Sequence, residues 1–194
     1  MTEWITDRII LFLIQKGVLV QDEDIYRYGT ESTVYTILST LGLLFFGCIA
    51  GMAVQAVICI VIFYLNQSIG GGYHANTHMR CFIVMLSGLL VGLAVTWYIS
   101  NIRLLSVFCG LGLLVLFAFP LVLHPQLQFL AGKEWQLKKR SNICTCVQAV
   151  LFIVANFVMI PQITVPYFIA IILSAISRIA GRYVYKHRKI TTTV

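Results

Sequence analysis

The chain is interrupted at one place by Gly70-Gly-Gly-Tyr-His-Ala-Asn-Thr-His-Met-Arg-Cys81, a polar, glycine-rich stretch between long apolar segments. Three successive glycines argue against a helix at their position, because glycine loses more conformational freedom than any other residue when it becomes helical. Asn76 or Thr77 can cap a helix that starts directly afterwards. The pattern therefore predicts a glycine hinge, a loop that carries His74, and a helix with Cys81 in its first turns.

The composition on both sides of this stretch is that of an integral membrane protein. Hydrophobic residues make up 59% of the 194 residues and charged residues only 11%, which is too apolar for a soluble domain. No acidic residue occurs between Glu31 and Glu134. We therefore predict an all-α integral membrane protein with about six transmembrane helices and an N-terminal amphipathic interfacial helix.

Six apolar segments approach the length of about 20 residues that a spanning helix needs. The predicted spans are Thr33–Gly47, Gly51–Leu65, Cys81–Ser100, Leu104–Leu123, Ile143–Ile160 and Ile163–Gly181, the last two divided by Pro161. Around Leu41–Ala53, either a hairpin or one long bent helix fits the pattern. The whole chain is predicted to be one membrane domain: N-terminal cytoplasmic or interfacial helices over 1–31, six helices over 32–181, and a basic cytoplasmic tail over 182–194.

The first 17 residues predict a helix that lies on the lipid bilayer. Thr2–Gly17 mixes apolar and charged residues, and its apolar run is too short to span. Gly17 is a plausible end for this helix, and Asp22-Glu23-Asp24 suits the first turn of a second one.

The basic residues predict orientation in the membrane. The formal net charge is +7, yet these residues sit at segment ends and form no basic face with interleaved aromatics, so we expect no nucleic-acid partner. With six spans and the N-terminus inside, thirteen Lys and Arg residues lie on the cytoplasmic side and only Arg103 outside. This asymmetry predicts that both termini and the Gly70–Cys81 stretch are cytoplasmic, where thiols stay reduced.

A thiol and an imidazole are the minimal groups for nucleophilic catalysis. On one continuous helix, His74 and Cys81 would lie about 10.5 Å apart along the axis, too far for a hydrogen bond. His78 is one turn from Cys81 and is the natural local base, whereas His74 reaches Cys81 only if its loop folds back. The helix dipole and Arg80 both favour the thiolate.

Other interpretations of this stretch remain open at this point. Asn66, Gln67 or Asn76 could orient the imidazole, and a Cys/His dyad is equally compatible with the sequence. The H-x-x-x-H spacing with a cysteine would suit zinc, but no carboxylate is nearby, so we predict no metal and no cofactor. A non-enzymatic small membrane transporter or metal-binding membrane protein is the alternative class, although the spans lack Asp and Glu.

The stretch resembles the accessory gene regulator B family, membrane cysteine endopeptidases of Gram-positive quorum-sensing systems. The resemblance rests on Gly71-Gly72-Tyr73-His74-Ala75 and on Thr77-His78-Met79-Arg80-Cys81, supported by the chain length, the six spans and a basic loop from Lys133 to Arg140. It implies that His74 and Cys81 are the catalytic pair, with His74 rather than His78 as the base.

The resemblance also implies a substrate and a reaction. The substrate is a short amphipathic propeptide at the cytoplasmic face of a bacterial cell membrane, whose C-terminal tail is removed through an acyl-enzyme thioester. A cysteine or serine of the propeptide then closes a thiolactone or lactone ring. Members of the family often carry a basic pair upstream of the glycines, where this chain has Asn66-Gln67-Ser68. The residues expected to bind substrate or orient the site are Gly71, Gly72, Asn76, His78, Arg80, Lys138, Lys139 and Arg140. The resemblance further indicates a homodimer.

Overall fold

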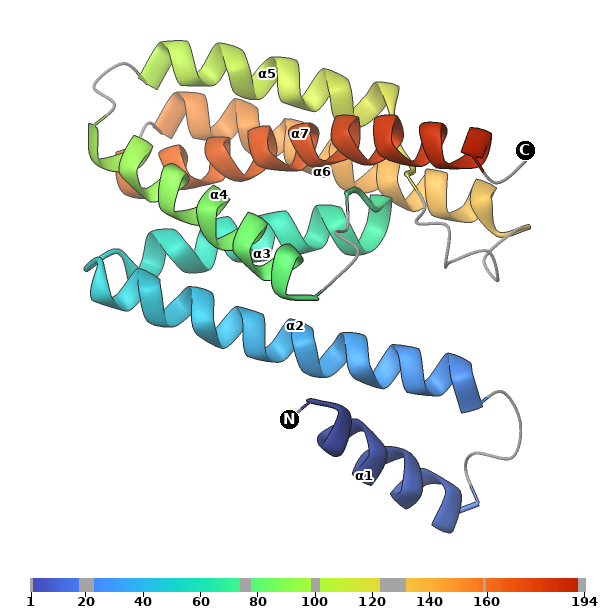
Figure 1. The fold of residues 1–194 in the computed structure, drawn as a ribbon. Helices are drawn as coiled ribbons and strands as arrows, with labels where there is room; N and C mark the ends of the chain where they lie inside the picture. The colour runs from blue at the N-terminus through green and yellow to red at the C-terminus, as the bar shows by residue number, and fades with distance from the viewer. Residues whose placement is uncertain are drawn as a thin grey trace. The chain divides into compact units, whose positions relative to one another are not determined.

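The computed structural model describes residues 2–17, 23–73, 78–98, 102–122, 132–158 and 160–191. These residues form seven helices, which Figure 1 shows in chain order: α1 (Thr2–Gln15), α2 (Glu23–Ile49), α3 (Ala53–Gly70), α4 (His78–Tyr98), α5 (Ile102–Ala118), α6 (Glu134–Val158) and α7 (Pro161–Thr191). Within the described ranges the extended pairing is a single isolated bridge, between Gly71 and Val122. The all-α prediction is confirmed.

The chain divides into two compact units, residues 1–46 and 47–194. In the first unit, α1 ends where the sequence predicted: Gly17 has a φ of 66° and its N–H donates to the Ile14 carbonyl at 2.9 Å. A left-handed glycine at this position is a common helix stop. Asp7 of α1 and Arg27 of α2 form an ion pair at 2.8 Å, which links the two helices.

Helix α2 is longer than expected. A helix starting near Asp22–Asp24 and a span starting at Thr33 were predicted separately, but both belong to one helix from Glu23 to Ile49. The threonines in its middle do not break it, because Thr33, Thr36 and Thr40 each donate a hydroxyl hydrogen bond to the carbonyl four residues earlier.

The turn after α2 decides between the two alternatives for Leu41–Ala53, which are a pair of separate helices and one long bent helix. Gly51 has a φ of 68°, its N–H donates to the Cys48 carbonyl, and the Met52 N–H donates to the Gly47 carbonyl at 2.9 Å. This pair of hydrogen bonds is a Schellman motif, which ends a helix at a left-handed residue. Two separate helices therefore replace the single bent helix. A side chain at Gly47 would collide with Ala56, so the two helix ends are closely packed.

Five helices are long and apolar enough to cross a membrane; these segments are Gly29–Ile49, Ala53–Gly70, Arg80–Tyr98, Glu134–Val158 and Pro161–Tyr185. Helix α5 is the sixth apolar helix, with 17 residues. At 1.5 Å per residue it extends about 26 Å, slightly less than the hydrocarbon core of a bilayer. The protein is thus a multi-pass helical membrane protein, and its described residues include five helices long enough to span and one shorter apolar helix.

The predicted ends of α3 and α5 are wrong, and each difference has a local cause. Helix α3 continues to Gly70 instead of ending at Leu65, because the side chains of Asn66 and Ser68 hydrogen-bond to carbonyls of the preceding turn. Helix α5 ends at Ala118 instead of Leu123. The cause is Pro120, which disfavours helical geometry in the residue before it and lacks an N–H.

Helix α6 starts earlier than expected, at Glu134 instead of Ile143, so that Lys138, Lys139 and Arg140 are helical. The predicted basic loop is therefore wrong for Glu134 to Arg140. Two contacts between residues four apart favour the helix: Lys138 lies 4.0 Å from Glu134, and Lys139 lies over the Trp135 ring.

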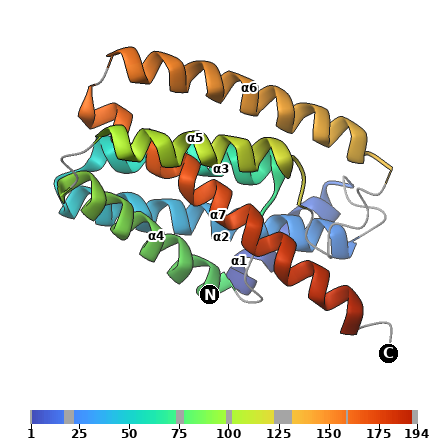
Figure 2. The ribbon, with the colours of Figure 1, turned by 90° about the horizontal axis from the view of Figure 1, so that it is seen from above.

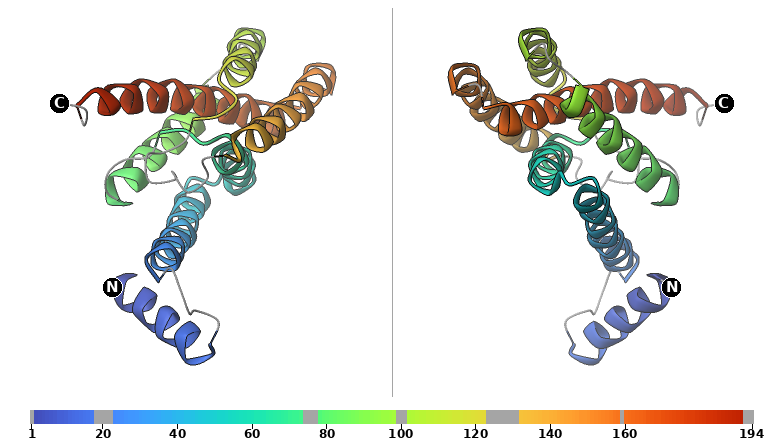
Figure 3. Two further views of the ribbon diagram at one scale, coloured as in Figure 1. Left: turned by 90° about the vertical axis from the view of Figure 1, so that its right-hand side faces the viewer. Right: turned by 90° about the vertical axis from the view of Figure 1, so that its left-hand side faces the viewer.

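Helix α7 is the central helix of the second unit. It packs mainly against α5 and α3, and Figures 2 and 3 show it crossing the other helices of this unit obliquely. Residues 164–171 are all buried, as expected for a helix surrounded by others. It starts at Pro161, a residue well suited to the first position of a helix, and continues through the predicted tail to Thr191.

Candidate active site

The glycine hinge is a sharp turn at the end of α3. Gly70 is still helical, so the expectation that none of the three glycines is helical is wrong for the first of them. Gly71 has a φ of 68°, and its N–H donates to the Gln67 carbonyl at 3.0 Å. A Cβ at Gly71 would fall on the Val122 carbonyl oxygen, and the Val122 N–H donates to the Gly70 carbonyl at 2.9 Å. The segment that follows α5 thus fixes the hinge from one side.

We expect substitution of Gly71 to cost more stability than substitution of Gly51. Both residues have a φ of 68°, but nothing lies within 4 Å of a Cβ at Gly51. Gly51→Ala therefore measures only the cost of left-handed geometry, about 1–2 kcal/mol. Gly71→Ala adds the collision with Val122, about 1–3 kcal/mol more. Thermal unfolding of both variants in detergent checks this. Equal losses for the two variants would contradict a hinge held against Val122.

Helix α7 fixes the hinge from the other side. The Tyr73 N–H donates to the Ser177 carbonyl at 2.9 Å and lies 3.1 Å from the Ser177 hydroxyl. The Tyr185 hydroxyl donates to the Gly72 carbonyl at 3.2 Å. Gln67, at the end of α3, donates its side-chain amide to the Ser177 hydroxyl. The backbone leading into the predicted catalytic loop is therefore bound to a helix more than 100 residues away in sequence.

A buried arginine lies beneath the hinge. The Arg178 side chain is almost completely buried, and a Cβ at Gly70 would overlap its guanidinium group. It donates to the carbonyls of Leu116 and Phe119, at 3.1 and 3.0 Å, and its Nη2 lies 3.5 Å from the Asn66 carbonyl. These carbonyls lie near the C-terminal ends of α5 and α3, where backbone oxygens lack helical partners and a cation is favourable. Arg178 therefore binds the ends of two helices to the centre of α7.

The contacts of Asn66 and Gln67 bear on their predicted role. Asn66 is buried, with its amide donated to the Ile62 carbonyl, and Gln67 contacts Ser177. The side-chain amide oxygens of both residues are buried and have no hydrogen-bond partner among the described residues. The structure thus gives both residues contacts within the helix bundle, and their proposed contact with an imidazole stays a prediction.

Cys81 is placed as the sequence predicted. Helix α4 starts at His78, directly after Thr77, so Cys81 is its fourth residue. The thiol is half-buried and is not in a disulfide; none of the six cysteines, all of which are described, forms one. Arg80, next to it, is exposed. A thiol in the first turn of a helix lies at the positive end of the helix dipole, which favours the thiolate.

The histidines are not tested by this geometry. His74 and Asn76 lie outside the described residues, as does the side chain of His78. The choice between the two imidazoles, and the zinc alternative that depends on both, therefore stay predictions. The structure fixes both ends of the loop: Tyr73 is hydrogen-bonded to Ser177 of α7, and the other end is the start of α4.

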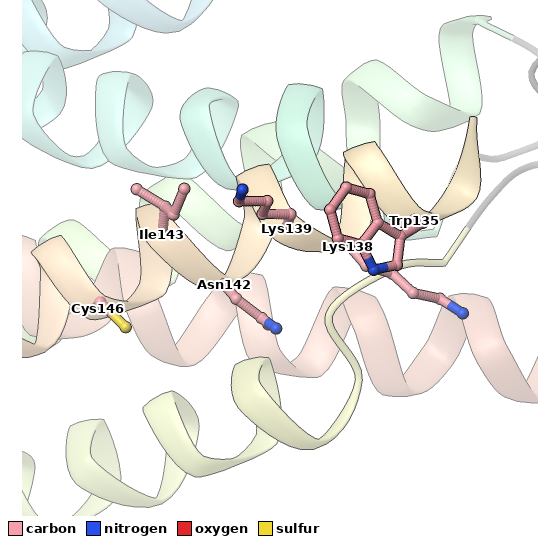
Figure 4. A pocket seen from close by; sticks show the side chains of 6 residues that line it. All are labelled: Trp135, Lys138, Lys139, Asn142, Ile143 and Cys146. Carbon is pink, nitrogen blue, oxygen red and sulfur yellow. The ribbon is translucent and has the colours of Figure 1, made fainter.

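Two basic residues of α6 line a recess that does not include the hinge. Lys138 and Lys139 line a surface recess of about 510 Å³. Figure 4 shows the lining side chains, which all come from α6: Trp135, Lys138, Lys139, Asn142, Ile143 and Cys146. Cys81 and the hinge glycines do not line it. Arg140 is exposed on the same helix.

Fold and site together define a class: a multi-pass helical membrane protein with a cysteine in the first turn of a helix that follows an anchored glycine hinge. A comparison of the sequence with known protein families assigns the protein to one of them. Residues 6–180 match the accessory gene regulator B family, and because this match covers most of the chain, the protein belongs to that family. Membership gives it a role in the processing of an autoinducing peptide. The curated proteins and the solved structures contain no significant match.

Four residues of α7 contribute to the site although the motif did not include them: Ser177, Arg178, Gly181 and Tyr185. One signal was available in the sequence. Arg178 lies inside an otherwise apolar segment, where an ionisable residue usually has a function. The charge count includes Arg178 among the thirteen cytoplasmic cations, which is wrong because Arg178 is buried in the helix bundle. Twelve cations against Arg103 remain, so the predicted orientation is unchanged.

Proposed function

We propose that the protein is a cysteine endopeptidase that removes the C-terminal tail of a short propeptide and closes the remaining peptide into a ring. Membership of the family supports a role in peptide processing. The observation that carries the catalytic assignment is the position of Cys81, in the first turn of α4 directly after the anchored hinge. The charge asymmetry of the sequence supports a site on the cytoplasmic face of the membrane.

The reaction has two acyl transfers. The Cys81 thiolate attacks the carbonyl carbon of the scissile peptide bond after His74 accepts the thiol proton, and the C–N bond breaks as the imidazolium protonates the leaving amine. The propeptide body is then a thioester of Cys81. A thiol or hydroxyl of the propeptide attacks the same carbonyl carbon, forms the ring, and releases Cys81 as a thiolate that takes up a proton. A site with little water favours this step over hydrolysis.

Substrate recruitment has a candidate surface on α6. The recess lined by Lys138 and Lys139 combines two cations with the Trp135 ring, which suits an acidic peptide segment. This surface would take the place of the basic pair that members of the family carry upstream of the hinge. In this proposal Arg80 and Arg140, both exposed, add to the same attraction.

A synthetic propeptide tests the function. Full-length protein in liposomes is incubated with the peptide, and the products are analysed by mass spectrometry. We expect two products, the free tail and a macrocycle lighter by one water than the linear fragment. Intact peptide on the far side of the membrane, with no cleavage, would contradict the proposal and favour the transporter alternative.

A further inference from the structure

One face of α7 contacts the backbone that leads into the catalytic loop. Ser177, Gly181 and Tyr185 are spaced four residues apart, so they share a face of the helix. Each of them meets Gly72 or Tyr73: Ser177 and Tyr185 through hydrogen bonds, Gly181 through direct approach of the two backbones. Together the three form a continuous contact along two turns of α7.

Two glycines make this approach close. A Cβ at Gly181 would lie 2.8 Å from the Gly72 carbonyl carbon and from the Tyr73 nitrogen. A Cβ at Gly72 would lie 2.7 Å from the Ser177 hydroxyl oxygen and would overlap the Gln67 side chain. Both distances are shorter than packed atoms allow, so a side chain at either glycine forces the chains apart. The position of Tyr73 is therefore set by α7.

His74 follows Tyr73 directly, and consecutive Cα atoms are about 3.8 Å apart. A displacement of Gly72 or Tyr73 therefore moves the point from which the chain leads to His74. Cys81, in contrast, is placed by α4, so α7 and α4 hold the two ends of the loop between them. The buried Tyr185 is the last of these contacts along α7 and acts on the carbonyl of Gly72.

We propose that Tyr185 is a positioning residue for the catalytic pair: its hydroxyl holds the Gly72 carbonyl so that the His74 imidazole reaches the Cys81 thiol. This inference rests on the proposed function. Tyr185 touches neither the substrate nor the reacting atoms, and its effect passes through the backbone of the hinge. A misplacement of about 1 Å in an active site can reduce the rate about 100-fold.

The test is Tyr185→Phe, which removes one oxygen and keeps the ring. Tyr183→Phe is the matched control, because Tyr183 is on the same helix and 68% exposed. For full-length protein in liposomes we expect Tyr185→Phe to lower kcat for propeptide cleavage about 10- to 100-fold with KM unchanged. Tyr183→Phe should leave both constants as they are.

A second measurement separates positioning from general support of the fold. The rate of Cys81 alkylation by iodoacetamide is followed against pH, in a background in which the other five cysteines are alanine. If Tyr185 positions His74, the Tyr185→Phe profile shifts in the same direction as that of His74→Ala, at an unchanged unfolding temperature. A loss of kcat with an unshifted profile, or wild-type kcat, would overturn the proposal.

Gly181→Ala tests the same face of α7 at a second position. Its methyl group enters the space of Gly72 and Tyr73, so it should lower kcat and shift the alkylation profile in the same way as Tyr185→Phe. Failure of the two proposals is distinguishable. If Cys81→Ala still processes the propeptide, the proposed function fails; if Cys81→Ala is inactive but Tyr185→Phe behaves as wild type, only the positioning role of Tyr185 fails.

Discussion

Replacement of Cys81 by alanine is expected to abolish processing of the propeptide, with a loss of at least about 10³-fold in kcat. The reason is chemical, because the acyl-enzyme thioester needs the sulfur of Cys81. The measurement is tail release from the propeptide, quantified by mass spectrometry after co-expression or in liposomes. Binding should survive, because the variant keeps the recess on α6 and the hinge.

A second cysteine provides the control for this experiment. Cys48 is exposed on α2, away from the recess on α6, and its alanine variant should process the propeptide at the wild-type rate. Loss of activity in Cys146→Ala combined with activity in Cys81→Ala would move the nucleophile to α6 and end the present assignment.

Replacement of His74 by alanine should be almost as damaging, about 10²- to 10⁴-fold in kcat, because general acid–base catalysis contributes about that much. His78→Ala should stay within a few-fold of the wild-type rate. His78 is the first residue of α4 and lies one helical turn before Cys81, so it is the rival base in geometry. Both variants are measured side by side with the same propeptide. Retention of activity in His74→Ala together with its loss in His78→Ala would reverse the assignment.

Much of the fold follows from the sequence because membrane helices are long apolar runs bounded by polar residues and glycine. The stops at Gly17 and Gly51 are examples, since both adopt the left-handed geometry that ends a helix. The start of α4 just before Cys81 also follows from the sequence, because a polar capping pair precedes an apolar run.

The wrong predictions concern polar residues whose hydrogen-bond partners are distant in the chain. The polar residues at the end of α3 were predicted to lie outside the helix. They are helical, and the side-chain amide of Gln67 donates a hydrogen bond to the Ser177 hydroxyl of α7. The sequence pattern places Arg178 at the membrane surface, whereas the side chain is buried among backbone carbonyl groups of α3 and α5. A sequence pattern shows which residues are polar, but only the packed helices show which groups those residues meet. The contact of Ser177, Gly181 and Tyr185 with the hinge therefore could not be predicted from the sequence.

The central claim is that Cys81 carries the acyl group of the propeptide. A propeptide whose ring-closing cysteine or serine is replaced by alanine cannot complete the second step, so the thioester should accumulate on the enzyme. Intact-mass and fragment analysis of the full-length protein then locates the adduct. We predict a hydroxylamine-sensitive adduct with the mass of the tail-less propeptide on Cys81. An adduct on another residue, or tail release without any adduct and without dependence on Cys81, would contradict the account.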